Sequence, residues 1–560
     1  MKKRIIIAGL LVCFAAAPVL WYKGRPVYRQ YKERRSLAQA RRFVEKGDFR
    51  NASLSARQTL QSNPGNIDAC KILAELAQRS HSPHLLDWRR RLVELTPTTE
   101  NKLLLASAAL RIQGPPYPLA EQTLDEMAVV ADSVPAYHVI AAELALKRRD
   151  LSKAQAQFQR AAQLEPTNEL HHLNLAVLRL QSKSLAEAAE ARATLERLRS
   201  SPAVGTAALR WLVAANIQNR EWAAAEAFSK ELLANSQATL DDRLQRLGIM
   251  QITKDPEFGN YLATLQNHSR TNATEVYSIG SWMAGHDLAR PALEWLSNCP
   301  AQIRTEQPAP LAFVDCYVLL KDWSGLQSFL QPLKWADLEF LRFALLSRTA
   351  AEQKETLAAD ARWRSAIREA GERLGPLMTL LGLAGTWGRD KAREDLLWQI
   401  AQRFPREHWA AQELGRLYQN SGNTRGLNKL SALIASYNSK DFQAQNNLAT
   451  TCFLLKLNLP KAHEVAKEIY QQHGEQPVIA STYAFSIFLQ GRTNEAVQIL
   501  EKFNNEELEN PPVALYYGFF LSAAGNTNRA AKYLEIAKLK EDSFLPEERA
   551  LLVQASHSIQ

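Results

Sequence analysis

Residues that could carry metal or acid–base chemistry are scattered along the chain rather than grouped. His171 and His172 are adjacent, so on a helix they point to different sides and cannot bind one metal ion together. His81 and His84 have a usable spacing, but no nearby cysteine or pair of carboxylates completes a set of ligands. We therefore interpret these histidines as surface residues and expect no metal centre.

The cysteines and the sequence motifs agree with this interpretation. Cys70, Cys299, Cys316 and Cys452 lie far apart without a C-x-x-C pair, so neither zinc nor a dense disulfide framework is indicated. Buried free thiols are favoured, with a Cys299–Cys316 disulfide as the alternative for an exported protein. The phosphate-binding patterns G-x-x-x-x-G-K-S/T and G-x-G-x-x-G do not occur, nor does H-E-x-x-H. We expect no enzymatic activity and no cofactor.

The composition predicts an all-α chain. Of the 560 residues, 46% are hydrophobic and 22% are charged. Good helix formers such as Ala, Leu, Gln, Glu and Arg dominate, whereas alternation of Val, Ile and Thr is almost absent. A chain of this length exceeds one compact core, so it must form several domains or an elongated array.

The net charge of +10 is confined to the N-terminus. Residues 1–50 hold 13 of the 68 basic residues and 3 of the 58 acidic ones, which leaves 55 of each in the rest of the chain. Because this remainder is neutral, it offers no general phosphate-binding surface. We therefore expect no nucleic-acid partner.

Residues 5–22 form an uncharged stretch after the short basic tail 1–4. Its length is about the minimum that spans a bilayer, and Trp21 and Tyr22 lie at its end as interfacial aromatic residues do. This predicts an uncleaved transmembrane signal-anchor helix. A cleaved signal peptide with a small-residue site at 15–17, or lipidation of Cys13, is the alternative.

The charges around the predicted span disagree about its orientation. Three basic residues precede it, which is typical of a tail that stays in the cytoplasm, whereas eight follow within 20 residues, six of them in the basic juxtamembrane segment 23–35. We expect a single-pass protein of the bacterial inner membrane, with the large part favoured on the extracytoplasmic side. The basic segment is also expected to contact anionic headgroups.

A short sequence motif recurs in the last quarter of the chain. Its four copies place Thr424, Leu459, Thr493 and Thr527 at intervals of 35, 34 and 34 residues. The same register continues backwards through eleven earlier marker positions: Phe49, Pro83, Tyr117, Leu151, Leu185, Trp222, Phe258, Leu288, Trp323, Leu357 and Arg389. A fixed period of about 34 residues predicts a solenoid of stacked repeats.

The residues inside these repeats resemble the tetratricopeptide-repeat family over nearly all of 33–545. The resemblance rests on Leu414-Gly415 with Tyr418, and on Ala40, Gly47-Asp48-Phe49 and Ala52 in the first unit. It implies two helices per unit, with small residues where they approach and Phe49 filling the adjacent space. The expected fold is an all-α, tetratricopeptide-type helix-turn-helix solenoid, a superhelix of about 15 units after one transmembrane helix. Its parts are an N-terminal array at 36–300, a C-terminal array at 301–545 and a capping helix at 546–560.

Members of that family typically bind peptides or partner helices in a concave groove lined by the first helix of each unit. In the clearest units, the corresponding positions are Gln412, Arg416, Gln419, Asn447, Thr451, Ser481, Phe485 and Phe519. The resemblance thus implies a protein or peptide partner, such as an amphipathic helix or an extended segment with apolar anchors. The alternative for Phe485 and Phe519 is burial between repeats.

The expected function is that of a membrane-anchored scaffold for protein–protein interaction in the assembly of the cell envelope or of a surface polymer. The alternative is a carbohydrate- or polymer-binding solenoid that uses the eight tryptophans between residues 282 and 409. Core filling is the favoured interpretation of those tryptophans, with Trp387 and Trp409 as the better candidates for exposure.

Overall fold

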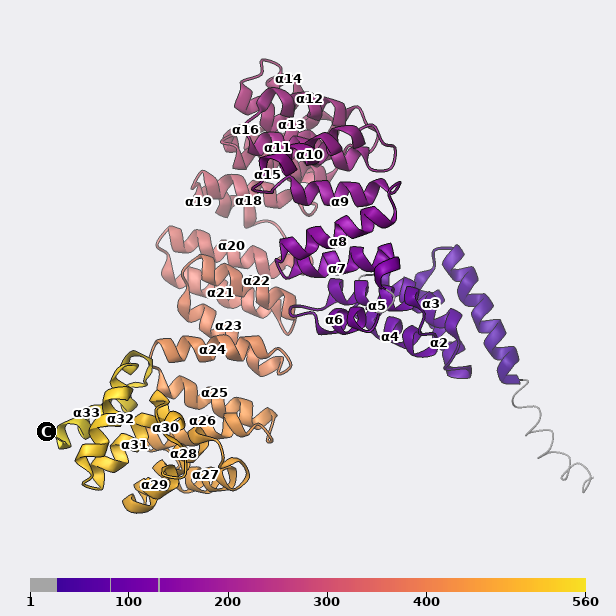
Figure 1. Cartoon of the computed structure of the whole chain (residues 1–560). Coiled ribbons are helices and arrows are strands. Elements are labelled where there is room, and N and C mark those ends of the chain that lie inside the picture. Colours follow the sequence, from indigo (N-terminus) through magenta and orange to yellow (C-terminus); the bar gives the residue numbers. More distant parts are fainter. Residues whose placement is uncertain (1–27, 81, 129–130, 560) are drawn as a thin grey trace, which may run out of the picture. The chain divides into compact units, whose positions relative to one another are not determined.

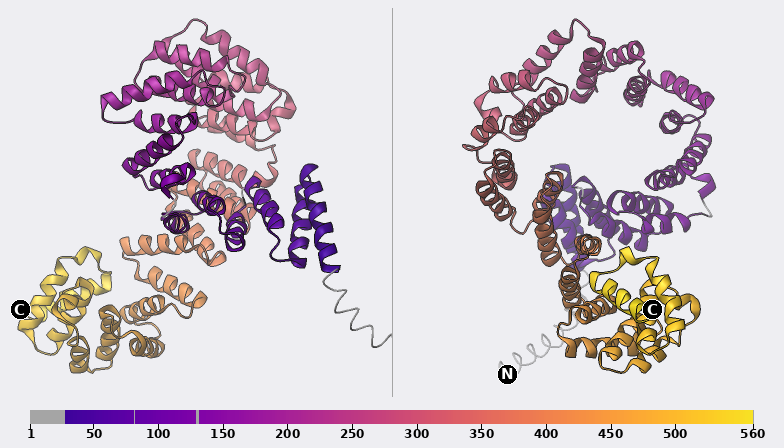
Figure 2. Two further views of the ribbon diagram at one scale, coloured as in Figure 1. Left: turned by 45° about the vertical axis from the view of Figure 1, so that its right-hand side comes forward. Right: turned by 90° about the vertical axis from the view of Figure 1, so that its left-hand side faces the viewer.

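The computed structural model describes residues 28–80, 82–128 and 131–559, and none of them forms a β-strand. The packing divides the chain into two compact units, one ending at Ser269 and the other beginning at Arg270. The predicted boundary between the arrays 36–300 and 301–545 lies inside the second unit, at the start of the short helix α17 (Ala301–Thr305). Within each unit the helices follow one another as antiparallel pairs (Figures 1 and 2).

In the first unit the described helix pairs are 28–45 with α2 (Phe49–Ser62), α3 (Ile67–Arg79) with α4 (Leu85–Leu95), α5 (Thr99–Ile112) with α6 (Pro118–Asp125), α7 (Pro135–Lys147) with α8 (Leu151–Leu164), α9 (Glu169–Arg179) with α10 (Leu185–Leu198), α11 (Gly205–Gln218) with α12 (Trp222–Leu233), and α13 (Leu240–Thr253) with α14 (Phe258–Ser269). Consecutive helices pack on each other, which is the contact pattern of a solenoid.

The second unit repeats the same pattern. Its described pairs are α15 (Ala273–Gly285) with α16 (Ala289–Ser297), α18 (Ala309–Leu319) with α19 (Trp323–Leu330), α20 (Glu339–Glu352) with α21 (Thr356–Ala370), α22 (Leu374–Thr386) with α23 (Asp390–Arg403), α24 (His408–Asn420) with α25 (Thr424–Tyr437), α26 (Phe442–Leu455) with α27 (Leu459–His473), α28 (Pro477–Leu489) with α29 (Thr493–Leu500), and α31 (Pro511–Ala523) with α32 (Thr527–Lys538). The short α30 (Asn505–Leu508) is inserted before the last pair, and α33 (Pro546–Ser558) follows it.

The repeat register predicted from the sequence agrees with the second helix of each pair. Ten of the fifteen marker positions are the first residue of such a helix, for example Leu151 of α8 and Thr424 of α25. The other five, including Pro83 before α4, lie within two residues of a helix start. The all-α, solenoid part of the predicted fold is therefore confirmed.

In most pairs, the turn has a residue in the left-handed region two positions before the second helix. Gly47 occupies this position with φ of 73°, and the next residue, Asp48, caps α2 by accepting a hydrogen bond from the backbone N–H of Asn51. Glycine adopts this backbone conformation without a Cβ clash. In other repeats a long exposed side chain takes the position, as Arg149 does with φ of 62°.

The two helices of a pair approach each other at small residues. Ala52 and Ala530, each in a second helix, have no exposed surface, as the family resemblance implies. Phe49, by contrast, does not fill the space beside them: it is 44% exposed, with the Arg79 guanidinium 5.4 Å from its ring centre. Phe49 points outward because the buried stripe of α2 begins three residues later at Ala52.

No helix among the described residues is long and apolar enough to cross a membrane. The predicted single-pass localisation in the bacterial inner membrane is corrected by this finding. The stretch 5–22, to which the sequence assigns the transmembrane helix, lies outside the described residues, as do residues 23–27 of the basic segment 23–35.

The close approach of helices α15 and α18 yields a test of this packing. A Cβ added at Gly280 would lie 2.7 Å from the Cβ of Ala312, so Gly280→Ala forces the two backbones apart. We expect the free energy of unfolding to fall by about 1–3 kcal/mol, which is typical of overpacking. The matched control is Gly382→Ala in α22, where no atom lies within 4 Å, and there the better helix propensity of alanine should raise stability by up to about 1 kcal/mol. Urea denaturation followed by circular dichroism measures both, and equal effects of the two substitutions would contradict the packing.

Candidate interaction surface

The residues predicted to line a partner groove divide into an exposed and a buried half. Gln412, Arg416 and Gln419 lie on α24 and Asn447 on α26, all with exposed side chains. The buried half comprises Thr451, Ser481, Phe485 and Phe519, from α26, α28 and α31. The structure therefore does not bring all eight to one open surface.

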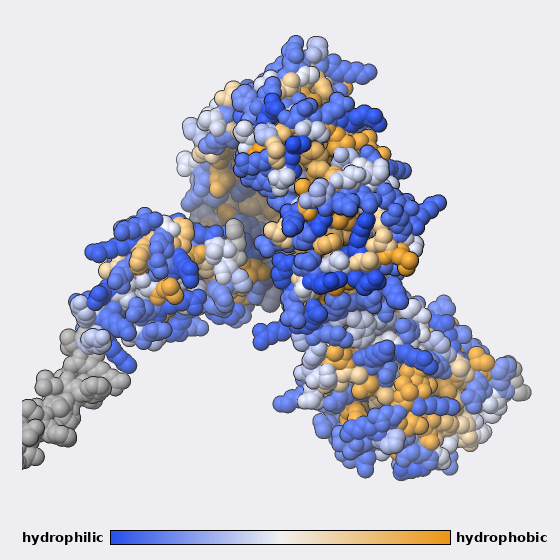
Figure 3. All heavy atoms as spheres, turned by 180° about the vertical axis from the view of Figure 1, so that it is seen from behind, coloured by the Kyte–Doolittle hydropathy of each residue, from blue (hydrophilic) through white to orange (hydrophobic). Residues whose placement is uncertain are grey.

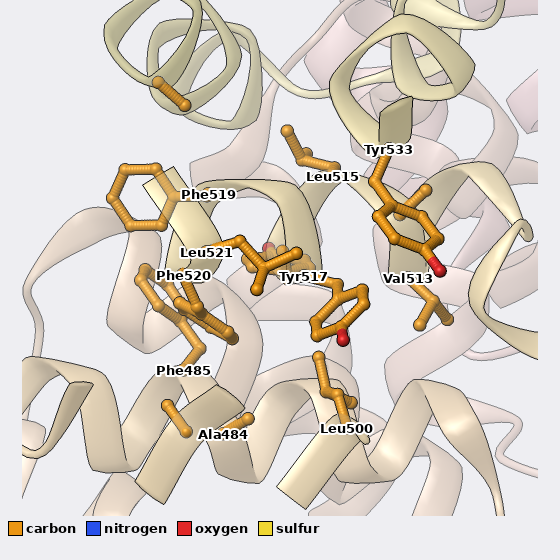
Figure 4. Close-up of a cluster of buried hydrophobic side chains, with 14 of the residues drawn as sticks. Ala484, Phe485, Leu500, Val513, Leu515, Tyr517, Phe519, Phe520, Leu521 and Tyr533 are labelled. Carbon is orange, nitrogen blue, oxygen red and sulfur yellow. The ribbon is translucent and has the colours of Figure 1, made fainter. Parts of the chain in front are cut away.

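Phe485 and Phe519 are part of the hydrophobic core of the last repeats (Figure 4). The ring of Phe485 lies 5.9 Å from that of Phe453 and 5.2 Å from that of Tyr516, measured between centroids. Phe519 packs edge-on against Phe488 at 5.0 Å. Such edge-to-face and tilted contacts are favourable arrangements of aromatic rings. The alternative interpretation, burial between repeats, describes both residues.

The four exposed residues form a polar surface. The guanidinium of Arg416 lies 3.7 Å from the Glu413 carboxylate, and its side chain is 77% exposed. Gln443 donates a hydrogen bond of 3.2 Å to the side-chain oxygen of Asn447. Gln419 instead donates to the backbone carbonyl of Ser543, 124 residues further along the chain, at 2.8 Å. This surface can form hydrogen bonds with a partner but lacks the apolar anchor expected of a groove.

The tryptophans of the second unit do not form an exposed platform either. All eight between residues 282 and 409 are buried or half-buried, including Trp387 and Trp409. Some make specific polar or ring contacts inside the fold: Trp409 donates to Glu407 at 3.1 Å, and Trp363 packs edge-on against Trp387 at 6.2 Å. Core filling, the favoured interpretation, therefore describes this group.

The described tryptophan that is exposed lies elsewhere, in the first unit. Trp211 of α11 has 40% of its surface exposed. It borders a groove with a volume of about 610 Å³ between α9, α10 and α11, which we call the Trp211 groove. The groove is lined by Val177, Leu180, Gln181, Ala188, Ala189, Arg192, Trp211, Ala214, Ala215, Gln218 and Asn219.

The helices α9–α11 position these residues by burying the opposite face of α11. Leu209, Leu212, Val213 and Asn216 face the core, which leaves Trp211 on the outer side of the helix. Small side chains of α10 and α11, among them Ala188 and Ala214, line the groove together with Val177, Leu180 and the Trp211 indole. An apolar floor beside an aromatic ring suits an apolar side chain of a partner.

The rim of the Trp211 groove is held by an ion pair. The Arg192 guanidinium contacts Glu221 at 2.5 Å and also donates to the Asn216 side chain, so α10 is tied to the turn between α11 and α12. The hydrogen bond from Arg192 lowers the pKa of Glu221, which keeps this carboxylate charged. The rim arginine is thus fixed in place next to the apolar floor.

The histidines and cysteines take structural positions. The ring of His171 contacts Glu165 at 2.8 Å and is buried, while that of His172 contacts the backbone carbonyl of Pro166 at 2.8 Å. Cys299 and Cys316 are free buried thiols rather than a disulfide. Within the part of the chain that the structure describes, no three His, Cys, Asp or Glu side chains are grouped so that they could hold a metal ion.

Sequence reasoning passed over Trp211, although a signal for it exists. The predicted tryptophan surface covers the stretch 282–409, where these residues are most frequent, and does not include Trp211. In α11, however, the apolar stripe runs through Leu209, Leu212 and Val213, and a helical wheel places Trp211 outside it. A large aromatic residue off the buried stripe is a direct indication of a surface site.

These features define the chain as an α-helical solenoid with an open groove in its first unit. No protein-family model matches the chain, and no curated protein does. Solved structures of tetratricopeptide-repeat proteins are similar to it. The MamA protein matches 30% of this chain with 96% of its own, at 15% identity and a TM-score of 0.27. The Pseudomonas aeruginosa pilF protein matches 43% of this chain with 92% of its own, at 14% identity and a TM-score of 0.25. The APC/C hetero-tetramer Cut9–Hcn1 matches 97% of this chain with 99% of its own chain, at 11% identity and a TM-score of 0.29. At these identities the similarity concerns fold alone, and the low TM-scores add no argument to the helix pairing described above.

The contrast between the buried and exposed halves of the predicted groove can be measured. Phe485→Ala should leave a cavity among Phe453, Tyr516 and Phe520, and we expect it to lower the free energy of unfolding by about 3–5 kcal/mol. Arg416→Ala, which removes an exposed side chain, should change it by less than about 0.5 kcal/mol. Urea denaturation of both variants is the measurement. A Phe485→Ala protein as stable as the natural one would show that this ring is not part of the core.

Proposed function

We propose that this protein is a scaffold that binds a protein or peptide partner, and that the Trp211 groove is a contact site. The observation that carries the proposal is the exposure of Trp211 beside an apolar floor and a fixed arginine. Tryptophan and arginine are the side chains most often responsible for binding energy in protein interfaces. The partner we expect presents an apolar side chain to the floor and a hydrogen-bond acceptor to the rim.

The polar surface of the second unit is proposed as an additional contact. The amides of Gln412 and Asn447 and the guanidinium of Arg416 can form hydrogen bonds with a partner. Gln419 already donates to the backbone carbonyl of Ser543. Surfaces of this kind fix the orientation of a partner rather than its affinity. We do not extend the proposal to carbohydrate, because the eight tryptophans on which that alternative rests are buried or half-buried.

The proposal is tested with a photoreactive amino acid placed at position 211 of the full chain in its native cells. The crosslinked protein is identified by mass spectrometry, purified and titrated against the natural chain and against Trp211→Ala. Loss of a central aromatic contact costs about 2 kcal/mol or more, so we expect the Kd to rise at least about 30-fold.

Leu185→Ala is the matched control, because Leu185 is 87% exposed at the start of α10 and does not line the groove. Its Kd should equal that of the natural chain. If Trp211→Ala binds the crosslinked protein as tightly as Leu185→Ala does, the Trp211 groove is not a partner site.

A further inference from the structure

The helix α33 is held by residues that precede it by more than a hundred positions. Gln419 of α24 donates to the backbone carbonyl of Ser543 at 2.8 Å, just before the helix begins. The hydroxyl of Thr424, the first residue of α25, donates to the Glu547 carboxylate. Packing of α33 on α26, α31 and α32 completes the contact. The helix therefore does more than cover the last pair, which is the role that the sequence predicts for 546–560.

Two successive carboxylates in the first turn of α33 are recognised by hydroxyl groups. Glu547 faces Thr424, and Glu548 accepts a hydrogen bond of 2.9 Å from the hydroxyl of Tyr516 in α31. Thr424 and Tyr516 are themselves buried, with 3% and 4% exposure. The nearby Arg549 donates to the carbonyls of Glu541 and Asp542 instead. The two carboxylates thus accept hydrogen bonds from neutral hydroxyl groups rather than from a cation.

The apolar face of α33 lies in line with this acidic turn. Leu552 and Ala555, each 2% exposed, follow Glu548 at intervals of four and three residues and pack into the core of the last repeats. Ser522 of α31 donates to the carbonyl of Ala555 at 3.2 Å. Val553, on the opposite side, is 49% exposed. An amphipathic helix laid across first helices is a recurring mode of peptide recognition.

We propose that the surface formed by Gln419, Thr424, Tyr516 and Ser522 is a helix-binding site, selective for an amphipathic helix with two acidic residues in its first turn, and that α33 is its intramolecular occupant. A partner helix of this chemistry binds by displacing α33. This inference concerns a site separate from the Trp211 groove and does not depend on it.

One observation favours a displaceable helix over a permanent part of the core. Glu548 lies against the buried Tyr516 hydroxyl without a cation, and removal of a charge from water without a counter-charge is unfavourable. The connection from α32 is exposed at Leu539 (81%), whereas Phe544 and Leu545 just before α33 are 4% and 6% exposed, so displacement of α33 also releases these two side chains from the core. Helices with such local costs belong to the elements that open first.

The first experiment is hydrogen exchange of the full chain, followed by mass spectrometry. We expect the amides of α33 to exchange at least tenfold faster than those of α28 and α31, because the helix opens without unfolding of the repeats. Equal protection of α33 and α31 would mean that the helix opens only when the unit unfolds, and the proposal would be wrong.

The second experiment adds α33 to the protein as a separate peptide. A fluorescein-labelled peptide with the sequence of residues 541–558 is titrated with the natural full chain and with the full-length variant Glu547→Lys/Glu548→Lys, whose own α33 is disabled. We expect at least tenfold tighter binding to the variant, and loss of that gain when Thr424→Val and Tyr516→Phe are added. Peptide binding that does not differ between the natural chain and the variant overturns the proposal.

Substitution of two glycines tests the same site without reversing any charge. Gly422 and Gly491 both have positive φ, at 62° and 81°, so alanine strains the backbone at either position. Only at Gly422 would the new methyl group meet Pro546, at 3.2 Å, and push on the start of α33. We expect Gly422→Ala to bind the peptide at least threefold more tightly than Gly491→Ala does; equal binding by the two would contradict the site.

Binding of the peptide should also depend on pH. Burial, chiefly, and the neighbouring Glu547 raise the pKa of Glu548 above its ordinary value of 4.5 when the helix is docked. The other titratable group that contacts it, Tyr516, has its pKa raised by burial and by Glu548 itself. A raised pKa in the docked state means that protonation favours docking, so binding is tightest below pH 4.5 and weakens as pH rises through the raised value.

A peptide with Gln in place of Glu548 isolates this carboxyl group. Its amide can donate to the Tyr516 oxygen while its carbonyl accepts from the Leu545 backbone N–H, the second partner of Glu548 at 3.0 Å. We expect its affinity to vary less between pH 5 and pH 7.5 than that of the natural peptide. An identical pH dependence of the two peptides would assign the effect to another group.

Discussion

The structure depends on the close approach of two helices at small residues. Ala52 and Ala530 have no exposed surface, and at Gly518 an added Cβ would lie 2.9 Å from Leu534. A larger side chain at these places would separate the helices and expose the apolar face that each pair contributes. Because one pair cannot bury that face alone, the next pair must cover it, and the array propagates from contact to contact. Hydrophilic side chains surround the apolar areas that remain at the surface (Figure 3).

This dependence on local contacts explains why the repeat architecture is predictable from sequence. A left-handed turn residue, a capping side chain and a small residue recur at fixed distances, as at Gly47, Asp48 and Ala52, and each is required within a few residues of the others. The period locates second helices even where the match is weak, for example at Thr356, one residue from the predicted position. Local requirements of this kind leave a trace in any single sequence.

Whether the side chains of the first helices are exposed or buried depends on contacts between repeats. This could not be predicted from the sequence in the same way. The family resemblance places Phe485 on a groove, but its ring meets Tyr516 and Phe520, more than thirty residues away. Thr424 meets Glu547 at a separation of 123 residues. Such contacts join residues of different repeats, and a position count within one repeat carries no information about them. The outward position of Trp211, in contrast, is a local property of α11 and was within reach of the sequence.

The Trp211 groove and the site under α33, as proposed, recognise a partner by shape and hydrogen bonding rather than by net charge. Beyond the N-terminal 50 residues the chain has equal numbers of basic and acidic side chains, so no long-range field attracts a partner. At the Trp211 groove the rim arginine is already paired with Glu221, and under α33 hydroxyl groups contact the acidic turn. Neutral donors discriminate by geometry, because a helix without acceptors at both positions leaves buried hydroxyl groups unpaired. The proposed scaffold thus selects a partner by complementary structure at these two sites.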